Sequence, residues 1–240
     1  MIERKSPIAV PSRPVTYAGA GTGITADAQK VLRNTYMLLS MTLLFSAMMS
    51  GVAMAIGLPL LPMHSIISLV GMLGLLFWVH KARESAMGLV AVFAFTGFIG
   101  FMLGPVLTAY IKFIPNGGQL LLMSLGGTGT IFLGLSAVAL TTKKDFSFMG
   151  GFLLAGMLVV FFAALATMVA GMFGVAITGA VLAISCVAML IFSAAILYDT
   201  SRIIHGGETN YISATVALYL DIYNIFMALL NITGIMSSDD

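Results

Sequence analysis

The chain has 240 residues, of which 60% are hydrophobic and only 8% charged, and its formal net charge is +2. Soluble domains carry about 25% charged residues, so this composition excludes an ordinary water-soluble globule. The single cysteine excludes a disulfide scaffold and a cysteine-based zinc site. So small a net charge does not indicate nucleic-acid binding. We therefore expect the chain to lie in a lipid bilayer.

The first 33 residues differ from the rest because they are rich in charge and contain three prolines. Residues 1–33 are predicted to form a flexible tail on the cytoplasmic side. They lack the short apolar core and the small-residue cleavage site of a signal peptide, so we expect no processing.

From residue 34 onward, apolar runs alternate with short polar breaks. They predict seven helices over residues 34–56, 61–80, 86–111, 118–140, 149–170, 176–204 and 211–235. About 20 helical residues cross a hydrocarbon core of about 30 Å, and each run is long enough. The expected fold is an all-α, polytopic membrane bundle of seven transmembrane helices, which forms one domain over residues 34–240.

The basic residues predict the orientation, because Lys and Arg are enriched in cytoplasmic loops. Seven lie at helix ends on the side of the N-terminus, and Lys112 alone lies on the opposite side. The seven are Lys30, Arg33, Lys81, Arg83, Lys143, Lys144 and Arg202. The N-terminus is therefore predicted to be cytoplasmic and the C-terminus to lie outside. If the last helix dips in and returns, the C-terminus is cytoplasmic instead.

Small residues predict where helices approach each other closely in lipid. Gly100 and Gly104 are four residues apart and form one face of the helix predicted over residues 86–111.

Two acidic residues, Asp199 and Asp221, lie inside predicted spans. An ionised side chain at mid-membrane costs at least about 2.5 kcal/mol, so such a residue is a functional candidate. At 100° per residue, Asp221, Asn224 and Asn231 share one stripe of the last helix, which predicts a polar seam facing the bundle interior. The alternative is a structural seam in which a neutral Asp221 hydrogen-bonds to neighbouring helices.

Asp199 lies near the cytoplasmic end of its helix, and Arg202 follows three residues later. A helix-end ion pair without function is therefore one interpretation. In the other, modest helix tilts bring Asp199 and Asp221 together, and the two carboxyl groups share a proton because both cannot be ionised cheaply there. The deprotonated pair would repel itself and offer oxygen ligands to calcium. This interpretation predicts a pH-sensitive gate and a transient calcium site at Asp199 and Asp221.

The helix over residues 61–80 ends in a group of cations that could act as a latch on these acids. His80 is the side chain most able to titrate, whereas Lys81 and Arg83 are better interpreted as ordinary anchors at the cytoplasmic interface.

The sequence does not favour an enzyme. Ser136 could be an intramembrane nucleophile, but no predicted helix supplies a membrane-buried histidine to activate it. An aspartic protease built on the two acids is a weaker alternative, because neither acid follows a glycine. No cofactor is expected.

Four strings stand out: Gly88-Leu-Val-Ala91, then after eight residues Gly100-Phe-Met-Leu-Gly-Pro-Val-Leu107, then Leu197-Tyr-Asp-Thr200 and Leu218-Tyr-Leu-Asp-Ile-Tyr-Asn224. Together they resemble the motifs of the transmembrane Bax-inhibitor-motif family. The string Ile203-Ile-His-Gly-Gly-Glu-Thr-Asn-Tyr211 is similar to the bacterial YccA branch. The resemblance extends from about residue 30 to the end of the chain.

The resemblance implies seven helices with the last one central, and a pH-sensitive calcium leak in the bacterial inner membrane that is governed by Asp199 and Asp221. It also implies a latch after Phe77-Trp78-Val79, where a bacterial relative has arginine and this chain has His80. Either His80 replaces that arginine, or Lys81 or Arg83 does. In this topology the C-terminus is periplasmic.

The YccA branch also implies a second function, as a substrate and modulator of an FtsH-type membrane protease. Residues 1–33 would then be the segment that the protease holds.

Overall fold

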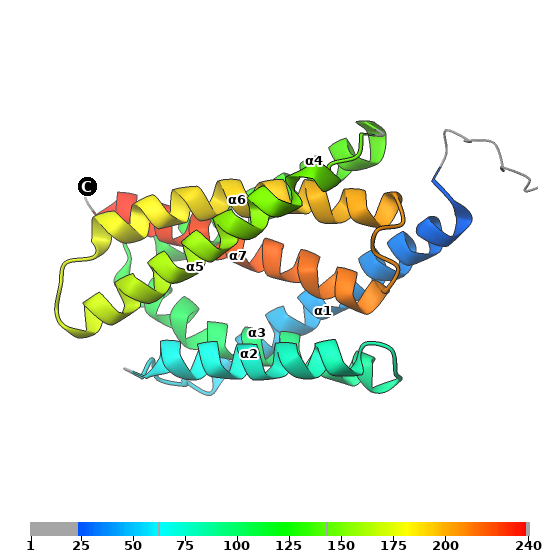
Figure 1. The fold of residues 1–240 in the computed structure, drawn as a ribbon. Coiled ribbons are helices and arrows are strands. Elements are labelled where there is room, and N and C mark those ends of the chain that lie inside the picture. The colour runs from blue at the N-terminus through cyan, green and yellow to red at the C-terminus, as the bar shows by residue number, and fades with distance from the viewer. Residues whose placement is uncertain (1–23, 62, 143, 239–240) are drawn as a thin grey trace, which may run out of the picture.

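The computed structural model describes residues 24–61, 63–142 and 144–238. These residues form seven long helices and one short 3-10 helix (Figure 1). In chain order they are α1 (Ala26–Ala55), α2 (His64–Ala82), α3 (Met87–Phe113), α4 (Gly117–Thr142), η1 (Ser147–Met149), α5 (Gly150–Met172), α6 (Thr178–Ile204) and α7 (Tyr211–Ser238). All seven long helices are long and apolar enough to cross a membrane. The predicted all-α membrane bundle is confirmed.

The largest difference from the predicted boundaries is at the start of α1, which begins at Ala26 rather than at residue 34. The Thr25 side chain caps the helix by accepting a hydrogen bond from the Ala28 N–H, and Asp27 lies in the first turn, where a negative charge is favourable. Hydropathy missed residues 26–33, about two turns, because a helix that extends beyond the bilayer can be polar on every side. Residues 1–23 of the predicted tail lie outside the described residues.

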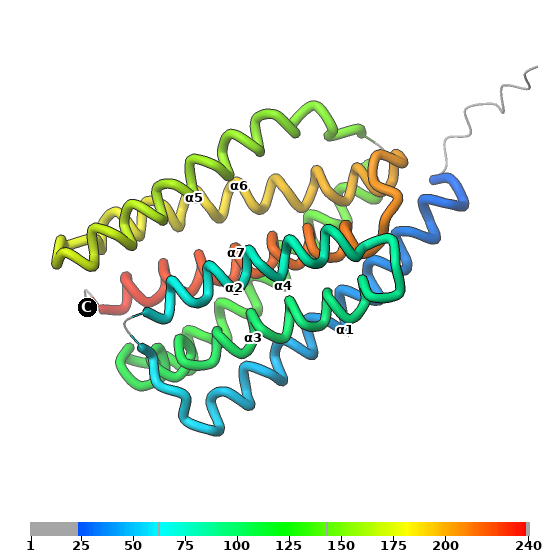
Figure 2. Tube along the Cα trace, turned by 60° about the horizontal axis from the view of Figure 1, so that its bottom comes forward, coloured from blue at the N-terminus to red at the C-terminus, as the bar shows by residue number. Residues whose placement is uncertain are grey.

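The last helix is the central one, as the resemblance implies. In its most apolar stretch 61% of the residues of α7 are buried, against 6% in α2. It packs against α1, α3, α4 and α6. Figure 2 shows α7 between α5 and α6 on one side and α1 and α3 on the other.

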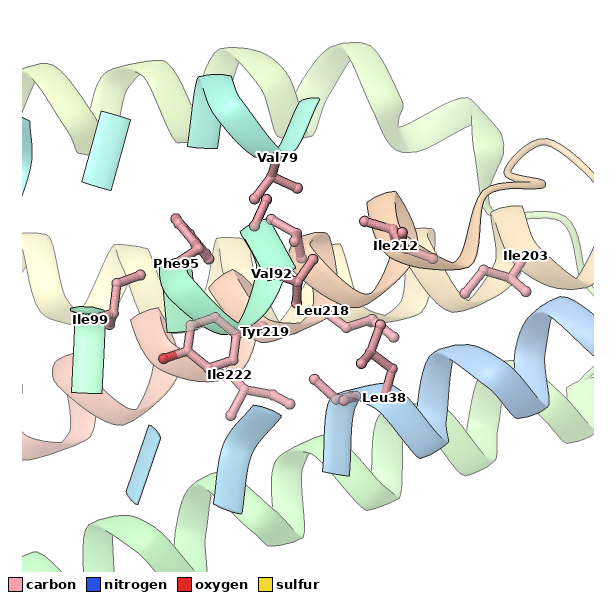
Figure 3. Packing of buried hydrophobic residues seen from close by; sticks show 14 residues of the cluster. Leu38, Val79, Val92, Phe95, Ile99, Ile203, Ile212, Leu218, Tyr219 and Ile222 are labelled. Atoms are coloured by element: carbon pink, nitrogen blue, oxygen red, sulfur yellow. The ribbon is translucent and has the colours of Figure 1, made fainter. Parts of the chain in front are cut away.

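The main apolar core surrounds the first half of α7 and joins it to α1, α2, α3 and α6 (Figure 3). Leu218 is completely buried there, and the ring of Tyr219 meets Phe95 edge to face, with 6.0 Å between the ring centroids. Because aromatic pairs prefer this geometry, they fix the height of α7 relative to α3. The position of Asp221, two residues further along, is fixed with it.

The contact between α1 and α3 depends on small residues, as the spacing of Gly100 and Gly104 predicts. A Cβ atom on Gly100 would overlap the backbone of Ser46, and one on Gly104 would lie 2.8 Å from the Ser50 carbonyl oxygen. The two helix backbones therefore approach each other directly, which maximises van der Waals contact where lipid supplies no hydrophobic force.

The connections α2–α3, α4–α5 and α6–α7 lie at the same end of the bundle as the start of α1 (Figure 1). The α6–α7 connection is tight: α6 ends at Ile204, and Gly206 has a φ of 75°, a left-handed conformation that favours glycine. This turn reverses the chain so that the end of α6 and the start of α7 run side by side.

Candidate functional site

Asp199 of α6 and Asp221 of α7 face each other across the helix interface, with their carboxyl groups close enough for a hydrogen bond when one of them is protonated. The Asp199 side chain is 15% exposed and Asp221 is 2% exposed. Two ionised carboxylates have no proton to donate, so a hydrogen bond between them requires one proton on the pair. The structure thus brings together the two acids that the sequence singles out.

A third charged group, Arg202, connects Asp199 to the α6–α7 connection. One guanidinium nitrogen lies 3.9 Å from Asp199 Oδ1, and the other lies 3.8 Å from Glu208 Oε2 and donates a hydrogen bond to the Gly207 carbonyl. The guanidinium also lies over the Tyr198 ring. The helix-end ion pair and the aspartate pair are therefore both present, because Asp199 contacts Arg202 and Asp221 at once.

Asp221 is in a different environment. Its Oδ2 atom is buried and has no hydrogen-bond partner among the described residues. Leaving a buried polar atom unpaired costs about 1–3 kcal/mol, and more if the group is charged. The two carboxyl groups therefore have different environments: Asp199 has a cation beside it, whereas Asp221 is buried in the bundle.

The α4–α5 connection is anchored next to this pair. The Phe146 N–H donates to the Ser201 hydroxyl, two residues from Asp199 on α6. Hydrogen bonds from the Ser147 side chain and backbone lower the pKa of the exposed Asp145 carboxyl in the same connection. Two connections, α4–α5 and α6–α7, are thus tied to the last turns of α6 beside Asp199.

The predicted latch residues lie elsewhere. His80 and Lys81 are exposed at the end of α2. Arg83 donates to the Ser213 hydroxyl at 3.4 Å, which places it on the first turn of α7, about 12 Å along the helix from Asp221. The cation beside the acids is Arg202, the partner of Asp199 in the helix-end ion pair. Its spacing of three residues from Asp199 was the available signal.

The two asparagines of the polar seam of α7 have different hydrogen-bond partners. Asn224 donates to the Leu220 carbonyl of its own helix, whereas Asn231 donates to the Ser185 hydroxyl of α6 at 3.3 Å. Near the far end, Thr233 bonds to Tyr110 of α3 at 2.9 Å and lies 3.3 Å from the Ser124 hydroxyl of α4. Single hydroxyl groups in apolar helices carry no clear periodic signal, so sequence reasoning missed these partners.

The described residues contain no group of three or more His, Cys, Asp or Glu side chains arranged to hold a metal ion. Calcium takes six to eight oxygen ligands in a stable site. The aspartate pair supplies carboxylate ligands suited to a hard cation, but its two side chains are too few to form a storage site.

The comparisons with known proteins agree with this architecture. The family model described as inhibitor of apoptosis-promoting Bax1 matches residues 28–238. The chain is 50% identical to the Escherichia coli protein named "Modulator of FtsH protease YccA", over 89% of this chain and 93% of that protein. It is 50% identical to an uncharacterized membrane protein of Vibrio cholerae, over 90% of this chain and 94% of that protein.

A second Escherichia coli relative, equally similar, is named "Inner membrane protein YccA". None of these relatives is named as an enzyme. The family model covers nearly all of the helical bundle, and the relatives match over nearly their whole length. The chain therefore belongs to the Bax inhibitor family and is closely related to YccA.

Proposed function

We propose that this protein is a proton-controlled cation leak of the bacterial inner membrane, with calcium as the permeant ion and its N-terminus in the cytoplasm. The observation that supports the proposal most directly is the close approach of the Asp199 and Asp221 carboxyl groups at the interface of α6 with the central helix. Two carboxyl groups so placed respond to pH because the proton that joins them can leave.

With the proton in place, the hydrogen bond holds α6 against α7 and the bundle is closed. Loss of the proton leaves two negative charges in a low-dielectric contact, where they repel each other strongly. The helices then separate at this point, and the carboxylate oxygens become ligands for an entering cation. Leak is therefore expected to rise as pH rises.

The remaining polar contacts of α7 support a route toward the opposite end of the bundle. Asn231 with Ser185, and Thr233 with Tyr110, place hydroxyl and amide groups on the faces of α7 that meet α6, α3 and α4. An ion that leaves the aspartate pair along α7 would meet these oxygens rather than apolar side chains alone.

The direct test is calcium influx into liposomes that contain the purified full-length chain, measured with a trapped indicator between pH 5 and pH 8. We expect influx above that of protein-free liposomes, and an increase with pH. Influx equal to the protein-free control at every pH would exclude the leak.

Arg202 is expected to set the pH at which the leak opens, because its charge favours the ionised form of Asp199. A partly exposed ion pair is worth about 0.2–1 kcal/mol, so Arg202→Gln should move the midpoint upward by up to about 0.7 pH unit. The same flux assay measures the midpoint. Lys81→Gln, which removes an exposed cation at the same end of the bundle, should leave the midpoint unchanged; an equal shift in both variants would mean that only overall charge matters.

A second function is favoured by the name of the relative from Escherichia coli, a modulator of FtsH protease. We propose that this chain also occupies an FtsH-type protease in the same membrane, which holds it through residues 1–33. Because α1 begins at Ala26, deleting residues 2–23 shortens the segment offered to the protease and leaves the capped helix intact.

In a degradation assay with an FtsH-type protease and a membrane substrate, the full-length chain is expected to slow substrate loss and the shortened chain to have little effect. Calcium flux through the shortened chain should be unchanged. If the shortened chain still protects the substrate, residues 2–23 are not the segment that the protease holds.

A further inference from the structure

A cavity of about 480 Å³ lies between α1, α3, α4 and α7, on the opposite side of α7 from α6. It extends along α1 from Leu43 to Met54, which is about 16 Å. Its lining is almost entirely apolar, with aromatic rings from Phe132, Tyr223 and Phe226. None of the polar groups assigned to the proposed ion route lines it.

The cavity is partly open, and its walls α1 and α4 barely contact each other. Two glycines form part of its wall, Gly51 of α1 and Gly129 of α4. A Cβ atom added to either one would have no other atom within 4 Å. Nearby side chains that point away from the bundle are exposed and apolar, with Leu44 at 73% and Leu122 at 70%. In a membrane these side chains contact lipid tails, so whatever enters the cavity from this side comes from the bilayer.

The length and the lining indicate the occupant. The cavity is about 16 Å long and almost entirely apolar. A single hydrocarbon chain, whose contacts lie about 4 Å away on each side, fits this space.

One residue of the lining, Ser50, has a polar atom without a hydrogen-bond partner in the described part of the chain. The Ser50 hydroxyl is buried, with the residue 4% exposed, and it has no partner among the described residues. The other serine of α1 in the cavity, Ser46, is already bonded to the Tyr219 hydroxyl at 2.8 Å. Ser50 is five residues from the end of α1, about 7.5 Å, which is the end nearer the lipid ester groups of that leaflet.

We infer that this cavity binds one acyl chain of a bilayer phospholipid, which enters between α1 and α4 and descends from Ser50 toward Phe132. The Ser50 hydroxyl donates a hydrogen bond to the ester carbonyl of that chain. The lipid bridges α1 and α4, which barely contact each other directly, and fills space beside the central helix.

The test uses the full-length chain in nanodiscs that contain an ester phospholipid with a photoreactive diazirine in the middle of one acyl chain. Ile222 and Phe226 line the cavity from α7 and are at most 8% exposed, so lipid at the outer surface of the bundle does not reach them. We expect crosslinks to this part of α7 at a yield comparable with that on the lipid-facing helix α5. Crosslinks to α5 without any to α7 would overturn the inference.

Two glycine variants supply a matched comparison on one helix. Gly129→Leu fills the cavity and should remove the α7 crosslinks, whereas Gly126→Leu, on α4 but outside the cavity, should leave them unchanged. Gly51→Leu on the opposite wall should repeat the loss if Gly129→Leu fails to fold. Equal crosslinking in all variants would mean that the photoreactive chain reaches α7 by another route, and would overturn the inference.

Ser50→Ala tests the hydrogen bond. Loss of a hydrogen bond worth about 1 kcal/mol should lower the crosslinking yield on α7 about fivefold with the ester lipid. With the matching ether lipid, which has no carbonyl group, the crosslinking yield should not change. An unchanged yield with the ester lipid would exclude the role of Ser50.

Discussion

Asp221→Asn is expected to abolish the pH response of calcium flux. The amide of asparagine donates a hydrogen bond to Asp199 at any pH, so it mimics the protonated pair and holds α6 against α7 permanently. The two side chains have nearly the same size, so the packing around this 2% exposed position is retained. Flux should therefore remain at its low-pH level across the range from pH 5 to pH 8.

The native chain is the reference for the size of the change in calcium flux with pH. A switch that depends on one proton changes by at most about tenfold per pH unit, so flux at pH 8 should exceed flux at pH 5 by at most about a thousandfold. Asp145→Asn is the matched control, because it removes an exposed carboxylate in the α4–α5 connection near the same end of the bundle. A native pH response in Asp221→Asn would remove the aspartate pair as the gate.

Gly100→Ala is expected to lower the free energy of unfolding by about 1–3 kcal/mol, the usual range for overpacking. The added methyl group overlaps the backbone of Ser46 on α1, which cannot rotate away as a side chain can. The two helices must separate, and in lipid their association depends on this close packing. Thermal or denaturant unfolding in a mild detergent measures the loss.

Gly134→Ala on α4 is the matched control, because no atom lies within 4 Å of the added Cβ. Alanine forms helix better than glycine by up to about 1 kcal/mol, so this variant should be equally stable or more stable. Equal effects of the two substitutions would mean that the α1–α3 contact does not depend on Gly100.

The pH response and the stability of the bundle depend on different sides of α7. Its contact with α6 contains the acids and Asn231, whereas its contact with α1 and α3 contains Leu218, Tyr219 and the apolar core. Movement at the aspartate pair can therefore occur on one side while the other side holds the central helix in place.

The sequence alone determined the membrane fold, because burial in lipid is a local requirement. Each span must satisfy its own backbone hydrogen bonds and be apolar over about 20 residues. Both properties depend on consecutive residues only. Six of the seven helices accordingly begin within about three residues of their predicted starts. The same reasoning identifies Asp199 and Asp221, since an acid in an apolar run stands out without any knowledge of its neighbours.

The tertiary structure alone decided which groups meet. That Asp199 faces Asp221, and that Arg202 rather than His80, Lys81 or Arg83 lies beside them, depends on the rotation and height of each helix. These are set by contacts between distant residues, such as Phe95 with Tyr219 and Gly100 with Ser46. The cavity at Ser50 is of the same kind, because it is bounded by four helices and no single apolar run specifies a space between helices.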